Sequence, residues 1–110
     1  MKEEPLQEIV QRSERLYSEF LAARNQSGLP KALDAIELLG KIIEANGHLP
    51  SEVRGNIHGR LAQMWEGIEL LPGQAARTRA LENYRTALNC FAPETEIWAF
   101  THFNIAKLVL

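Results

Sequence analysis

The residues with the chemistry to bind a metal or to attack a substrate are His48, His58, His102 and Cys90. A metal site needs about four convergent ligands, and structural zinc usually takes closely spaced pairs such as Cys-x2-Cys, which this sequence lacks. His58 and His102 occupy one position of an internal repeat, so they should lie on neighbouring helices about 10 Å apart. We therefore expect no metal and no cofactor, and we predict that both histidines pack between helices.

A nucleophilic site would have to pair Cys90 with a histidine, because the chain has one cysteine. Catalysis needs a nucleophile, a base and an orienting group in one cleft. Cys90 instead lies in the apolar run from Ala87 to Phe91, which is typical of an inert, packed thiol. We therefore predict no catalytic residue and no enzymatic activity.

The elements that must position these residues are helices, because apolar residues recur every three or four positions along the whole chain. Helix-breaking residues separate five segments, at Gly28–Pro30, Asn46–Gly47, Pro72–Gly73 and Pro93. The segments span about residues 5–25, 30–46, 51–71, 75–91 and 94–110. Since the gaps are short, sequential helices are expected to pack as antiparallel hairpins.

Composition places the chain among small soluble domains, with 110 residues, 45% hydrophobic residues and a net charge of −2. This charge is not a nucleic-acid footprint. A lone cysteine excludes an internal disulfide and favours a reducing compartment. The first residues lack the features of a signal peptide, and no segment reaches the roughly 18 apolar residues of a membrane span. We expect a cytoplasmic protein without nucleic-acid or membrane partners.

An internal repeat joins the third and fifth predicted helices. The segment Leu61-Ala62-Gln63-Met64-Trp65 matches Ile105-Ala106-Lys107-Leu108-Val109 at an offset of 44 residues. In both, a small residue between large ones lets a neighbouring helix approach closely. The fourth helix has the spacing of a second repeat helix, with Ala80, Tyr84 and Ala87 on one face.

This pattern resembles the tetratricopeptide repeat. More narrowly, Trp98-Ala99, Thr101 and Asn104-Ile105-Ala106 resemble the long repeats of bacterial proteins that end in a caspase-like CHAT domain. The resemblance covers about residues 52–110 and implies an all-α fold of antiparallel helical hairpins in a right-handed solenoid. The second helix fits at an offset of 48 and the first helix does not fit. We therefore expect one helical-repeat domain over residues 1–110, with a capping helix at 1–28 and repeat helices at 30–110.

The resemblance also implies a concave groove, lined by the first helix of each repeat, that receives protein or peptide partners. Carried onto this sequence, its residues are Asn56, Gln63, Glu66, Phe100, Phe103 and Lys107. Gly59 and Gln63 stand where relatives that clamp a C-terminal carboxylate carry polar ligands, which argues against that specificity. The alternative interpretation is that these side chains are solvated or lie between helices, in a chain too short to form a proper groove.

The last predicted helix is apolar on more than one side. A surface of this kind is an interface or a liability. We expect it to be covered by a second copy, by a partner chain, or by the rest of a longer parent protein. The residues assigned to this self-association or partner surface are Trp98, Leu108, Val109 and Leu110.

These features together predict a protein–protein interaction scaffold or adaptor. Through the CHAT-type resemblance, it would be a regulatory part of a larger signalling or protease system. A different class remains as the alternative, namely a small-ligand-binding helical bundle. Its pocket would be walled by Trp65, Tyr84, Phe91 and Trp98.

Overall fold

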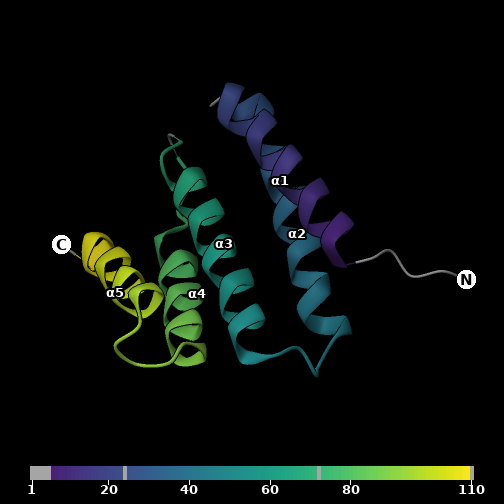
Figure 1. Cartoon of the computed structure of the whole chain (residues 1–110). Coiled ribbons are helices and arrows are strands. Elements are labelled where there is room, and N and C mark those ends of the chain that lie inside the picture. Colours follow the sequence, from purple (N-terminus) through teal and green to yellow (C-terminus); the bar gives the residue numbers. More distant parts are fainter. Residues whose placement is uncertain (1–5, 24, 72, 110) are drawn as a thin grey trace, which may run out of the picture. The chain divides into compact units, whose positions relative to one another are not determined.

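The computed structural model describes residues 6–23, 25–71 and 73–109, and all regular structure in these ranges is helical (Figure 1). The elements are α1 (Leu6–Ala23), the short 3-10 helix η1 (Gln26–Gly28), α2 (Leu29–Ala45), α3 (Ser51–Glu69), α4 (Arg77–Cys90) and α5 (Glu96–Val109). The prediction of an all-α chain with five α-helices is confirmed. The chain separates into two compact units, Met1–Gly47 and His48–Leu110, and each is described by itself.

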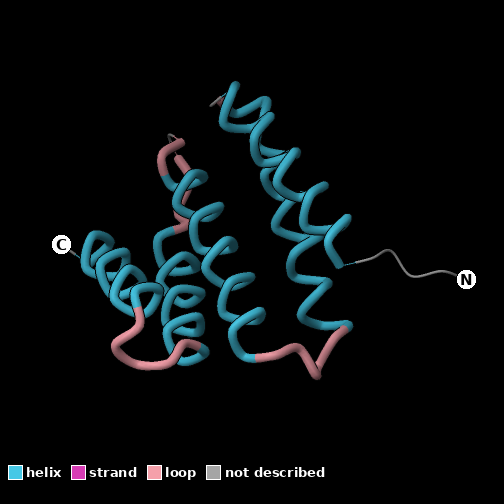
Figure 2. The backbone as a smooth tube through the Cα atoms, in the orientation of Figure 1, coloured by secondary structure: helices cyan, strands magenta, loops and turns pink. Residues whose placement is uncertain are grey.

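The first unit is a hairpin of α1 and α2 (Figure 2). From α1, Phe20 and Ser13 are buried, and the Ser13 hydroxyl is satisfied because it donates to the Val10 carbonyl at 2.8 Å. From α2, two alanines followed by two large aliphatic residues form one buried stripe at helical spacing. The stripe consists of Ala32, Ala35, Leu39 and Ile42, all buried.

The turn of this hairpin is closed by Asn25 and Gly28. The Asn25 side chain accepts hydrogen bonds from the Gly28 amide at 3.1 Å and from the Ser27 hydroxyl at 2.6 Å. Gly28 lies against the ring of Phe20, where an added Cβ would be 3.4 Å from Cδ1. Pro30 follows in the first turn of α2, where its missing N–H costs nothing. Helix α1 ends at Ala23 and α2 begins at Leu29, so the break lies just before the predicted Gly28–Pro30, and Pro30 itself is helical.

The second unit is built on the pairing of α3 with α4, and α5 packs on α4 (Figure 1). The core residues of α3 are Ile57, Leu61, Ala62, Met64 and Ile68. Those of α4 and the adjoining loops are Leu71, Ala76, Ala80, Tyr84, Ala87 and Phe91. Most follow the apolar stripes expected for these helices, so the sequence pattern predicts this hairpin well.

The boundaries of α5 differ from the expected start near residue 94. Glu94 has a positive φ of 70°, which a right-handed helix cannot include. Thr95 follows, and its hydroxyl accepts from the Trp98 amide at 3.3 Å, as an N-cap residue does. The helix therefore begins at Glu96, after a Thr cap that the sequence reading did not single out.

Gly55 sets how closely α3 and the end of α4 approach. A Cβ at this position would lie 2.7 Å from Phe91 Cε1 and 2.9 Å from Cys90 Cβ, too close for either. Glycine inside a helix costs about 1 kcal/mol relative to alanine, so the residue is unfavourable for the isolated helix. One turn later in α3, a Cβ added at Gly59 would meet no atom within 4 Å.

This contrast gives a matched test within one helix. We expect Gly55→Ala to destabilise the second unit by about 1–3 kcal/mol, because the Phe91 ring and Cys90 must move. Gly59→Ala should instead stabilise it by about 0.5–1 kcal/mol, because only the helix propensity changes. The measurement is urea unfolding followed by tryptophan fluorescence, since both tryptophans, Trp65 and Trp98, lie in this unit. Equal effects of the two substitutions would contradict the packing described.

Candidate interaction surface

Polar side chains join α3 to α4. The Glu66 carboxylate accepts a hydrogen bond from the Tyr84 hydroxyl. Glu69 accepts from the Ala76 amide at 2.8 Å, just before α4 begins. These bonds provide hydrogen-bond partners for half-buried polar groups of the hairpin. Of the predicted groove residues, Glu66 is therefore used inside the hairpin.

Two further contacts complete the seam between α3 and α4. His58 Nδ1 lies 2.9 Å from the Asn83 side-chain oxygen, so the structure packs this histidine between helices as predicted. The Arg79 guanidinium lies 4.7 Å from the centre of the Trp65 ring, a cation–π geometry. The seam therefore combines apolar packing with polar contacts along its length.

The prediction for His102 is wrong. Its side chain is exposed, and its ring meets Trp98 of the same helix edge-on, with ring centres 4.4 Å apart. The equivalent residue in the repeat, His58, finds Asn83 because α4 covers α3 there. His102 has no such contact with a following helix, and it packs locally instead.

The remaining groove residues fall on two helices. Asn56 and Gln63 are exposed on α3, and Phe100, Phe103 and Lys107 are exposed on α5. The Lys107 ammonium lies 5.5 Å from the centre of the Phe103 ring, one turn before it. The structure thus brings the two phenylalanines and the lysine together on one helix.

The polarity of α5 is the reverse of an ordinary surface helix. Its two buried residues are polar, Thr101 and Asn104, each 4% exposed. The Thr101 hydroxyl is satisfied by the Ile97 carbonyl at 2.7 Å. Large apolar side chains point outward instead: Ile97 (42% exposed), Phe100 (51%), Phe103 (59%) and Val109 (56%). Helices normally bury the apolar stripe and expose the polar one, so this outer surface is suited to contact another molecule.

The residues assigned from sequence to a self-association surface are not all on this outer face. Trp98 and Leu108 are half-buried, and Val109 is exposed. Leu110 lies outside the described residues. The most exposed aromatic side chains of α5 are those predicted for the groove, Phe100 and Phe103.

The repeat explains part of this exposure. Gly55 and Ala62 on α3 are buried, with Gly55 directly against the end of α4. Their counterparts 44 residues later, Ala99 and Ala106, are exposed on α5. The small residues that permit close helix packing on α3 therefore recur on α5 without a covering helix in the described chain.

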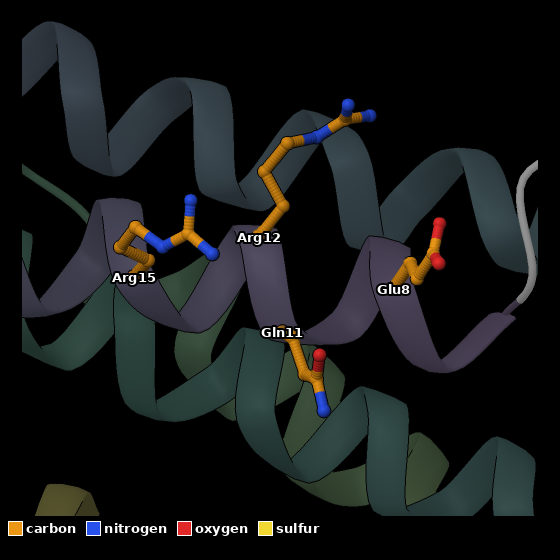
Figure 3. Close-up of a pocket in the computed structure, with 4 residues that line it drawn as sticks. All are labelled: Glu8, Gln11, Arg12 and Arg15. Atoms are coloured by element: carbon orange, nitrogen blue, oxygen red, sulfur yellow. The ribbon is translucent and has the colours of Figure 1, made fainter.

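A separate hollow lies on α1, where Glu8, Gln11, Arg12 and Arg15 line it (Figure 3). The sequence reading singled out none of these residues for binding. All four come from one helix, and Gln11 and Arg12 extend to opposite sides in the view. Because these side chains do not converge, the hollow lacks the enclosed and convergent character of a ligand site.

Two further properties of the described ranges are the grouping of metal-binding side chains and the apolar length of the helices. Within residues 6–23, 25–71 and 73–109, no three or more His, Cys, Asp or Glu side chains are grouped to hold a metal ion. None of the helices described there is both long and apolar enough to cross a bilayer. Cys90 is a half-buried free thiol beside Gly55.

No protein family, curated protein or solved structure matches this chain. The resemblance to tetratricopeptide repeats and to CHAT-type repeats therefore stays a prediction.

The Glu66–Tyr84 bond should stabilise the hairpin without taking part in recognition. We expect Tyr84→Phe to lower the free energy of unfolding by about 1–2 kcal/mol, because a half-buried carboxylate loses its donor. Urea unfolding by tryptophan fluorescence checks this. Glu82→Gln, on an exposed position of α4, serves as the control and should change stability by less than about 0.5 kcal/mol. A neutral Tyr84→Phe would mean that the bond does not hold the helices together.

Proposed function

We propose that the chain is a protein–protein interaction module that binds through the outward apolar surface of α5. The supporting observation is the reversed polarity of this helix, which buries Thr101 and Asn104 and exposes Phe100 and Phe103. Exposed aromatic side chains are the typical anchors of protein interfaces, where they desolvate in the centre of the contact. A chain without a partner gains nothing from placing them in water.

A protein partner is favoured over a small ligand. Small-molecule sites are concave and enclose most of the ligand, whereas Phe100 and Phe103 lie on the open side of a helix. The rings that would wall a bundle pocket have other contacts in the structure. Trp65 meets Arg79, Tyr84 bonds Glu66, Phe91 packs at Gly55, and Trp98 meets His102.

The proposal extends to the architecture. We propose that α2 to α5 are helices of a tetratricopeptide-like solenoid with α1 as its cap, and that α5 is the first helix of a further unit. The 44-residue offset between α3 and α5 and the small residues at Gly55, Ala62, Ala99 and Ala106 support this. On this interpretation Asn56 and Gln63 extend the binding surface, and the module acts in the cytoplasm as an adaptor or regulatory part of a larger signalling or protease system.

Affinity capture tests the proposed function. A tagged chain incubated with lysate of the source cells is crosslinked, and the bound proteins are identified by mass spectrometry. We expect at least one protein to be enriched by the wild type and lost with Phe103→Asp, because an acidic group at the centre of the apolar surface opposes desolvation.

The matched control is Leu70→Asp, the same kind of change at an exposed apolar residue of the second unit that is not on α5. It should retain the bound protein. Far-UV circular dichroism should show equal helicity in all three chains. Binding that survives Phe103→Asp, or that is lost equally with Leu70→Asp, would contradict recognition by α5.

A further inference from the structure

The exposed side of α5 carries a stripe of four residues, Glu96, Phe100, Phe103 and Lys107, which we call the α5 stripe. The spacings are four, three and four residues, so all four lie on one side of the helix. This is the spacing of the contact positions in paired helices. Each of the four is exposed.

The α5 stripe is complementary to itself when reversed. The midpoint between Phe100 and Phe103 and the midpoint between Glu96 and Lys107 coincide, between Thr101 and His102. A twofold axis through that point places each Phe100 against Phe103 of the second copy. It places each Glu96 against Lys107 of the second copy. Two aromatic contacts and two opposite-charge contacts then form at once, as a symmetric dimer interface requires.

We infer that α5 pairs antiparallel with α5 of a second copy of this chain, through the α5 stripe. This rests on the proposed function, since it names the partner of the same surface. A parallel pair would put Glu96 beside Glu96 and Lys107 beside Lys107, so charge selects the antiparallel arrangement. The helix dipole also favours an acid at the start of α5 and a base at its end. The dipole does not explain why Glu96 and Lys107 lie on the same side of α5 as Phe100 and Phe103.

Neighbouring residues fit this pairing. Ala99 and Ala106 are exposed on α5 and border the stripe, and small side chains there let two helix backbones come close. Lys107 already lies over the ring of Phe103. In the dimer, the Lys107 ammonium would keep its contact with the Phe103 ring and would also meet the Glu96 carboxylate of the second copy.

The α5 stripe shares no residue with the self-association surface predicted from the sequence. Trp98 and Leu108 are half-buried and Val109 lies off the α5 stripe, so none of them can be its centre.

The size of the contact sets the strength of the dimer. A helix of 14 residues is about 21 Å long, and one such contact buries less than the roughly 1,200 Å² of a standard interface. The dimer should therefore dissociate in the micromolar range.

Sedimentation velocity of the full chain over a concentration series tests the pairing. We expect a monomer–dimer equilibrium with a dissociation constant of roughly 1–100 µM. Phe103→Asp should weaken it by about a hundredfold, since the residue is used twice in a symmetric interface. Leu70→Asp, the same change at an exposed apolar residue outside α5, should stay within about twofold. Circular dichroism must show that α5 remains helical in both variants.

Charge exchange tests the orientation. Glu96→Lys alone and Lys107→Glu alone should each weaken the dimer about tenfold, because two attractive pairs become repulsive. The double variant E96K/K107E restores both pairs only in the antiparallel arrangement, and it should recover to within about threefold of the wild type. A double variant no better than the single ones, or a dimer indifferent to Phe103→Asp, overturns the inference.

The outcome also separates this inference from the proposed function. A wild type that stays monomeric to about 1 mM, far above the expected dissociation constant, overturns self-pairing. If that monomer still captures another protein through Phe103, the interaction function stands. If no protein depends on α5 for binding, both proposals fail.

Discussion

The second unit depends on how closely α3 and α4 approach. Glycine at position 55 admits the Phe91 ring at the end of α4, and the rest of the seam follows from that contact. With the helices this close, the Tyr84 hydroxyl reaches Glu66 and Asn83 reaches His58. Because α5 packs on α4, the position of the last helix is in turn set by this seam. A helix-destabilising residue is therefore kept where packing requires it.

The two sides of α4 differ in kind. Toward α3 there is an apolar core supplemented by satisfied polar groups, which gives the hairpin a defined geometry. Toward α5 the fully buried residues are the polar Thr101 and Asn104, and Trp98 and Leu108 are half-buried beside them. The two phenylalanines of α5, Phe100 and Phe103, are left for its outer face. The helix α5 thus buries two polar residues completely and presents two phenylalanines to solvent, which is the physical basis for proposing an interaction module.

The helices and their buried faces were predictable because they depend on local periodicity. Ile57, Leu61, Met64 and Tyr84 fall where the 3.6-residue stripe puts them. The sequence could not predict which side of α5 is covered by α4. Phe100 and Ile97 are both apolar residues at helical spacing, and only the packing of α4 decides that Thr101 is buried instead. For the same reason His58 lies between helices as predicted and His102 does not, since among the described residues a helix covers His58 and none covers His102.

The shallow anchoring of α5 has a consequence for its dynamics. The fully buried residues of α5 are polar, and its large apolar residues Trp98 and Leu108 are only half-buried, so this helix gains less from docking than α3 or α4 does. Segments with few buried apolar contacts open locally at a lower free energy than the core. Its amides should therefore exchange with solvent sooner than those of the α3–α4 hairpin. Any molecule that binds the outer face of α5 would raise the free energy of this local opening. Binding to α5 therefore also makes the helix more ordered.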